Sequence, residues 1–193
     1  MRPTRPRIPV LPPAERTERQ GDLLAPTTRD GRTFNVLATL VRHPDLLERW
    51  SAFAGHVMGP TSTLAPRERE ILILRIGWLN ASQYEFGQHV LFGRRAGLGD
   101  EEIERVKLGA VAPGWSPLEA ALCRAADDLH EHGVVTDDTW RALAAHYGEK
   151  QLLDVLFTVG QYNLVSWVLN SLGVELDEGV PRAFSTATPS NGS

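Results

Sequence analysis

The fold is decided by one stretch, Pro66-Arg-Glu-Arg-Glu-Ile-Leu-Ile-Leu-Arg-Ile-Gly-Trp-Leu79, and by the segment that follows it, Ser82-Gln-Tyr-Glu-Phe-Gly-Gln-His89. The first stretch begins with a proline, whose fixed φ suits the first position of a helix. Apolar residues then recur with the helical period. We therefore predict two consecutive helices, at 66–79 and 82–97.

The same signals recur on both sides of this pair. Helix starts are marked by Asp100 before two glutamates, by Ser116 before a proline and by Thr136 before two aspartates. No run of alternating β-branched residues is long enough for a sheet. The sequence therefore predicts an all-α fold, a single-domain bundle of about eight helices. The expected helices are 35–42, 44–57, 66–79, 82–97, 100–109, 117–132, 137–147 and 149–171.

Both ends of the chain differ in composition from this helical domain, which we place at 34–178. Residues 1–33 contain seven arginines and six prolines with little apolar periodicity, so we expect an extended arm that reaches a neighbouring molecule. Residues 179–193 are mostly polar, and we expect a disordered tail. The 193 residues suffice for one domain with a sizeable core.

Charge and cysteine content exclude several classes of protein. The formal net charge of −4 offers no basic surface for nucleic acid or an acidic membrane. One cysteine, Cys123, cannot form an intrachain disulfide. The N-terminus lacks the apolar segment of a secretory signal, and the apolar stretch 71–79 is too short to span a membrane. We therefore expect a soluble cytoplasmic protein.

Four polar residues form the candidate site. Glu70, Ser82, Glu85 and His89 follow the pattern E-x11-S-x2-E-x3-H, and the last three share one stripe of a helix. A carboxylate and an imidazole one turn apart, with a hydroxyl one turn earlier, can hold a small polar ligand and move a proton without a cofactor.

Each of these residues also has a purely structural interpretation. Ser82 and Glu85 have the spacing of a capping box at a helix start. His89 lies among apolar residues, where a histidine is most often a hydrogen-bonded core residue. Glu70 could mark the solvated edge of its helix; if buried, it needs a partner, and Arg67 and His89 are the candidates.

The sequence offers no convincing metal site. His130 and His132 are two residues apart near the end of a helix, where the helix dipole favours histidine and the spacing turns the rings away from each other. Glu85 and His89 are four residues apart rather than three as in di-iron motifs, and two ligands do not make a zinc site. We predict no metal and no cofactor.

From 35 to 178 the chain resembles the alkylhydroperoxidase D / carboxymuconolactone decarboxylase family. The peroxidase branch of that family carries E-x11-C-x2-C-x3-H, and the decarboxylase branch lacks the cysteine pair. Here Ser82 and Glu85 occupy the cysteine positions, so the resemblance is to the decarboxylase-like branch, and we expect no thiol peroxidase activity. The blocks that carry the resemblance are Pro66-Arg-Glu-Arg-Glu70, Tyr84-Glu-Phe-Gly-Gln-His89, Ala96-Gly-Leu-Gly-Asp-Glu-Glu-Ile103, Gly160-Gln-Tyr-Asn163 and Leu169-Asn-Ser-Leu-Gly-Val174.

The resemblance implies a cofactor-independent lyase that acts on a small lactone or unsaturated acid by decarboxylation, ring opening or isomerisation. His89 would transfer the proton and Glu70 would orient it, while Glu85, the third catalytic residue, would position the substrate together with Tyr84. Tyr84 and Ser82 would bind substrate, as would one of the polar residues of Gly160-Gln-Tyr-Asn163, for which we select Asn163. The chain would assemble as a homo-oligomer, as a dimer, trimer or hexamer.

Two points stay open at the level of the sequence. Two glutamates would repel an acidic substrate unless Arg75, Arg94 or Arg95 offset their charge. The alternative to an enzyme is a non-catalytic protein on the same scaffold, which binds a small molecule or serves assembly.

Overall fold

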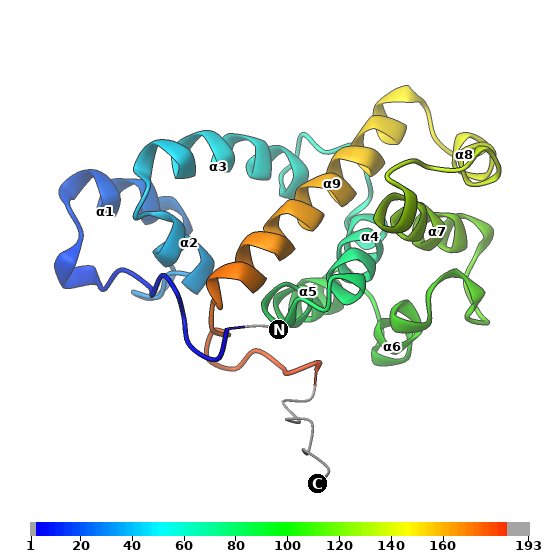
Figure 1. Cartoon of the computed structure of the whole chain (residues 1–193). Helices are drawn as coiled ribbons and strands as arrows, with labels where there is room; N and C mark the ends of the chain where they lie inside the picture. The colour runs from blue at the N-terminus through cyan, green and yellow to red at the C-terminus, as the bar shows by residue number, and fades with distance from the viewer. Residues whose placement is uncertain (1–2, 185–193) are drawn as a thin grey trace, which may run out of the picture.

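The computed structural model describes residues 3–184 and is helical throughout this range, apart from turns, 3-10 segments and an isolated bridge between Arg29 and Arg32 (Figure 1). The predicted all-α fold is confirmed, and most predicted boundaries agree within two residues. The helix predicted at 137–147 ends at Ala144. The helices are α1 (Glu18–Leu24), α2 (Asn35–Leu40), α3 (Pro44–Met58), α4 (Pro66–Leu79), α5 (Gln83–Arg95), α6 (Asp100–Leu108), α7 (Pro117–His132), α8 (Asp137–Ala144) and α9 (Glu149–Leu172).

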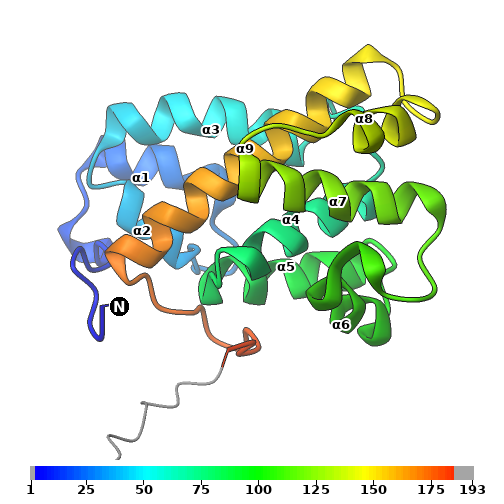
Figure 2. The ribbon, with the colours of Figure 1, turned by 45° about the vertical axis from the view of Figure 1, so that its right-hand side comes forward.

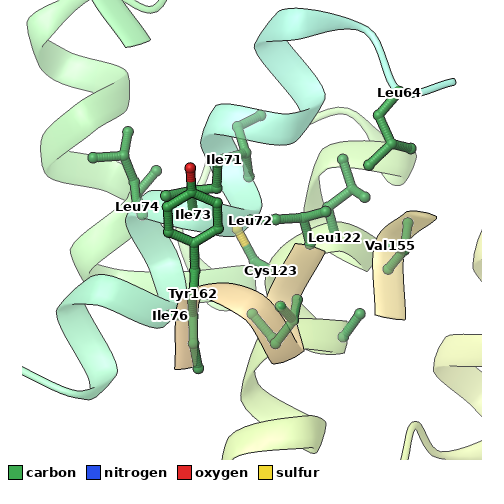
Figure 3. Packing of buried hydrophobic residues seen from close by; sticks show 14 of the residues in the cluster. Leu64, Ile71, Leu72, Ile73, Leu74, Ile76, Leu122, Cys123, Val155 and Tyr162 are labelled. Atoms are coloured by element: carbon green, nitrogen blue, oxygen red, sulfur yellow. The ribbon is translucent and has the colours of Figure 1, made fainter. Parts of the chain in front are cut away.

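Helix α4 lies at the centre of the domain. Its five consecutive positions 70–74 and Ile76 are at most 1% exposed. It contacts α5, α7 and α9, so it is covered on several sides, as expected for a helix that is apolar around most of its circumference. Figure 3 shows its aliphatic side chains against Leu122 and Cys123 of α7 and Val155 of α9.

Helix α9 separates α1–α3 from α4–α8, as the two views of the ribbon show (Figures 1 and 2). By length and composition alone this helix could cross a membrane, but 56% of its apolar window is buried inside the domain. That burial is typical of the core helix of a soluble protein. Helix α9 thus packs against helices of both groups, α3 on one side and α4, α5 and α7 on the other.

Three residues, Asn80, Ala81 and Ser82, connect α4 to α5. Ala81 adopts a left-handed conformation with φ of 46°, and the backbone N–H of Ser82 donates to the Gly77 carbonyl at 2.8 Å. A Cβ at Gly77 would lie 3.5 Å from the backbone nitrogen of Phe86. This close approach brings the start of α5 onto α4, with the Glu85 side chain beside Gly77.

The expectation of an extended N-terminal arm was wrong for part of 1–33. Residues 18–24 form α1, because Thr17 and Gln20 make a capping box, and a short helix follows this start. Leu11 and Leu24 are buried against α2 and α3. The segment therefore packs on its own domain over much of its length.

The C-terminal segment also differs from expectation up to residue 184. The Phe184 ring stacks on Trp78 with centroids 4.7 Å apart, and its backbone N–H donates to Gln83. Val180 and Pro181 lie so close to Gly87 that a Cβ there would come within 2.8 Å of both. Residues 179–184 thus pack against α4 and α5, while the predicted disorder of 185–193 lies outside the described residues.

Candidate functional site

A histidine held between two carboxylates forms the centre of the site. The Nδ1 atom of His89 lies 2.6 Å from Oε2 of Glu70, and its Nε2 atom lies 2.9 Å from Oε1 of Glu85. All three side chains are at most 5% exposed. The chain thus places the three predicted catalytic residues in contact, two from α5 and one from α4.

This arrangement favours a protonated imidazole. Burial by itself lowers the pKa of His89, but the charge and hydrogen bond of Glu70, together with those of Glu85, raise the pKa to about 9. Both ring nitrogens therefore carry a proton at neutral pH, and each donates to a carboxylate.

The capping-box interpretation does not describe Ser82 and Glu85. Ser82 precedes α5, but its hydroxyl is fully buried and has no hydrogen-bond partner among residues 3–184, while the Glu85 carboxylate contacts His89. The buried Glu70 finds its partner in His89 and not in Arg67, which binds Glu102 and Glu119.

A cavity of about 450 Å³ opens in front of His89 and Glu85, between the α2–α3 half of the molecule and helices α5 and α9. Glu70 does not line it, because it lies behind His89. Most of the wall is apolar or aromatic. The lining residues are Thr27, Phe34, Val36, Leu37, Trp50, Ser51, Ala54, Gly55, Met58, Tyr84, Glu85, Gln88, His89, Phe92, Gln161, Tyr162 and Val165.

Helix α9 contributes two polar residues to this cavity. The Tyr162 ring stands edge-on to His89 at 4.8 Å, and Gln161 lies beside it in the wall. Burial and the charges of Glu85 and Glu70 hold the pKa of the Tyr162 phenol well above its usual value, so it remains an O–H donor. Asn163 accepts a hydrogen bond from Asn80 and does not line the cavity.

Tyr84 and Gln88 line the cavity but are held from behind. The Tyr84 hydroxyl donates to Oδ2 of Asp177 at 2.5 Å, and the Gln88 amide donates to the same oxygen. Asp177 also accepts the backbone N–H of Asn35 at 2.9 Å. One carboxylate after α9 therefore fixes two residues of the wall and the start of α2. Ser82 does not line the cavity.

Removal of this carboxylate has a clear expected effect. Asp177→Ala leaves the Tyr84 hydroxyl and the Asn35 N–H without their acceptor, and we expect a loss of about 1–3 kcal/mol in the free energy of unfolding. Glu178→Ala is the matched control, because Glu178 pairs with Arg32 at the exposed surface. Denaturant unfolding compares the two; equal stability of both variants with the parent protein would contradict this role of Asp177.

The arginines that could offset the two glutamates lie away from the cavity. Arg75 pairs with Asp127 at 2.5 Å, Arg94 pairs with Asp100 at 2.8 Å, and the Arg95 guanidinium lies over the Phe92 ring. The three arginines considered from the sequence are therefore absent from the cavity wall.

No group of three or more His, Cys, Asp or Glu side chains in residues 3–184 is arranged to hold a metal ion. In the triad, each carboxylate points at a different nitrogen of His89. Cys123 is buried in α7, where burial raises the pKa of its thiol to about 12. That thiol therefore remains protonated and is a poor nucleophile.

Comparison with solved structures finds the same fold in proteins of low sequence identity. The alkylhydroperoxidase AhpD core of an uncharacterized peroxidase-related protein from Ralstonia eutropha JMP134 has a TM-score of 0.78 at 19% identity, covering 90% of this chain and 93% of that one. A peroxidase-related protein from Silicibacter sp. TM1040 has a TM-score of 0.76 at 17% identity, covering 92% and 96%.

A third structure carries a ligand. The debrominase Bmp8, in complex with 2,3,4-tribromopyrrole, has a TM-score of 0.72 at 9% identity, covering 91% of this chain and 94% of that one. The search of curated proteins gives no match. Residues 44–128, which include the whole triad, match the carboxymuconolactone decarboxylase family. The resemblance predicted from the sequence is thereby confirmed for residues 44–128, and the fold of the chain is AhpD-like.

Proposed function

We propose that this protein is a cofactor-independent enzyme of the carboxymuconolactone decarboxylase-like type, which moves a proton on a small lactone or unsaturated acid. The observation that carries the proposal is the contact of His89 with Glu70 and Glu85 at the inner end of a ligand-sized cavity. A buried acid–base pair of this kind is uncommon outside functional sites.

Glu85 and His89 share the proton that is exchanged with the substrate. Both residues line the cavity, and Nε2 of His89 already donates to Glu85, so an ionised Glu85 can take a proton from a carbon next to a carbonyl group. His89 stabilises the carboxylate before this step and can pass its own Nε2 proton forward. Glu70 fixes the imidazole through Nδ1, which makes it a positioning residue.

Negative charge that develops on the substrate oxygen needs a donor. The Tyr162 hydroxyl and the Gln161 amide lie in the same wall as His89, and the raised pKa of Tyr162 keeps its proton in place. A neutral donor in a largely apolar cavity stabilises an enolate more strongly than water does. Decarboxylation, ring opening and isomerisation all pass through such a charge on oxygen.

The solved structures add modest support for a small cyclic ligand. Bmp8, on the same fold, was crystallised with a brominated pyrrole ring. Substrate roles for Tyr84, Ser82 and Asn163 stay predictions; Tyr84 reaches the wall, and Ser82 and Asn163 could act only by supporting α5 and α9.

Proton exchange tests the proposal without knowledge of the product. α-Angelica lactone, whose ring carbon next to the carbonyl bears acidic hydrogens, is incubated with the protein in D₂O, and deuterium uptake is followed by NMR. We expect uptake well above the buffer rate. Binding of the lactone without any enhanced exchange would instead favour the non-catalytic alternative, a small-molecule-binding protein on this scaffold.

We also propose that the chain forms a homo-oligomer in the cytoplasm, with α9 as the contact. Leu153, Phe157, Leu164 and Trp167 are 48–57% exposed on this helix. With Gly160 they are spaced four and three residues apart in alternation, the pattern by which a helix pairs with a second copy of itself.

A charge on this stripe should separate the subunits. Phe157→Asp places a carboxylate in the proposed contact, and we expect light scattering to show a shift from oligomer towards the 21.3 kDa monomer. Val111→Asp is the control, since Val111 is 90% exposed on the short segment Gly109–Val111 away from α9. A parent protein that is already monomeric at micromolar concentration would refute this assembly.

A further inference from the structure

We propose that the cavity takes a neutral unsaturated lactone with an apolar substituent, and not a carboxylate, and that the reaction is a shift of the ring double bond. This inference rests on the proposed proton transfer at Glu85 and His89, and it selects one of the substrate classes that the proposed function leaves open.

The first observation is the composition of the wall. None of the lining residues is a lysine or an arginine. The charged side chains that reach the cavity are Glu85 and His89, and they contact each other at 2.9 Å. A carboxylate ligand would therefore meet another carboxylate and find no cation free to pair with it, which is costly against a largely apolar wall.

The charges behind the wall are balanced as well. Glu70 contacts His89 on one side, and its second oxygen lies 3.8 Å from Nε of Arg69. Two acids, Glu70 and Glu85, thus face two cations, His89 and Arg69, so the buried group sums to zero. No uncompensated positive charge remains to attract an anion.

Cations beside the cavity are offset too. A neighbouring surface depression shares Thr27 and Phe34 with the cavity and contains two arginines. It also contains three acids, and Arg32 pairs with one of them, Glu178, at 3.1 Å. The net charge of these two arginines and three acids is negative, so the neighbouring depression does not attract anionic ligands towards the cavity.

Shape and surface favour an apolar ring. Phe34, Trp50 and Phe92 supply aromatic faces, and Met58 and Val165 supply aliphatic ones. A volume of about 450 Å³ exceeds that of a bare five-membered ring and leaves room for a substituent. The ionisable groups of the wall lie together where Glu85 and His89 contact each other and Tyr162 stands edge-on to His89.

The reaction balances without a further reactant. In a lactone whose double bond lies one carbon away from conjugation, ionised Glu85 takes a proton from the carbon between the carbonyl and the double bond. The electron pair of that C–H bond forms a dienolate, whose oxygen accepts from Tyr162. The same proton then returns to the far end of the dienolate, and the double bond becomes conjugated with the carbonyl.

The test compares two ligands of nearly the same shape, one anionic and one neutral. A butenolide with a carboxymethyl group and the isosteric carboxamide are titrated into the protein at pH 7.5 by calorimetry. We expect the carboxamide to bind at least ten times more tightly. Equal or tighter binding of the carboxylate, or absence of binding by both at millimolar concentration, would overturn the proposal.

A variant with an added positive charge in the cavity wall tests whether wall charge sets the ligand preference. Met58→Lys adds an unpaired cation to a wall whose cation His89 already pairs with Glu85, and it should raise the affinity for the carboxylate relative to the carboxamide by at least tenfold. Met58→Gln, similar in length and uncharged, should leave the ratio unchanged. An unchanged ratio in Met58→Lys would show that wall charge does not set selectivity.

These measurements separate this inference from the proposed function. The binding ratio concerns the ligand class and is read without turnover, whereas isomerisation of α-angelica lactone is followed by NMR in the same samples. Preference for the neutral ligand without isomerisation would support the inferred ligand class and contradict the proposed enzymatic activity. Isomerisation combined with a preference for the carboxylate would contradict the inferred ligand class and support the proposed enzymatic activity.

Discussion

Replacement of His89 by glutamine is expected to lower the enzyme-catalysed exchange of lactone hydrogens by about 10²–10⁴-fold, the usual contribution of a general acid–base group. Glutamine can still donate one hydrogen bond to Glu70 or Glu85, so the fold should survive, but it cannot carry a proton. Glu70→Gln should give a smaller loss, because Glu70 positions the imidazole from behind and does not reach the cavity.

The combination of the two changes gives a sharper result. If Glu70 acts only through His89, the double variant should be no slower than His89→Gln alone. His56→Gln is the matched control, because His56 also contacts a carboxylate, that of Asp154 at 3.0 Å, but does not line the cavity. Exchange at the parental rate in folded His89→Gln protein would rule out the catalytic role of His89.

The second large effect is a dependence of stability on alkaline pH. The folded-state pKa of His89, about 9, lies above the unfolded value of 6.5, so the stabilisation is fully present below pH 6.5 and is lost as pH rises through 9. With about 1.4 kcal/mol for each tenfold change, this amounts to about 3 kcal/mol. For a chain of this size the loss corresponds to a decrease of about 6–12 °C in Tm.

The measurement is thermal unfolding at closely spaced pH values for the parent protein and for His89→Gln. The difference between the two curves cancels the ionisation of groups that do not contact His89. We expect the parental advantage to shrink between pH 6.5 and 9.5. A difference that stays constant over this range would mean that His89 does not bind an additional proton in the folded state.

The helices were predictable from the sequence because their ends carry strong local signals. Pro66 and Ser116 mark starts that the structure reproduces, and Gly133, with a left-handed φ of 71°, ends α7 where it was expected. Helix α1 was missed because its seven residues show too little apolar periodicity; its start is visible only in the capping box of Thr17 and Gln20.

The triad was predictable as well, since Glu85 and His89 are one turn apart and the turn after α4 is short. The cavity wall was harder to predict. Each residue of a helix is rotated by about 100° from the previous one, so a polar segment does not tell which member faces inward. Asn163 was chosen, but Gln161 and Tyr162 reach the cavity. The apolar residues that α2 and α3 contribute carry no signal of their own.

The most direct test of the central claim is a ¹⁵N NMR spectrum of the His89 ring at pH 7.5, recorded without and with α-angelica lactone. The claim is that a protonated His89, held between Glu70 and Glu85, meets the ligand. We expect both ring nitrogens to carry protons and the Nε2 signal to move when lactone is added. A neutral imidazole at this pH, or His89 signals that do not shift at a saturating concentration of lactone, would contradict this claim.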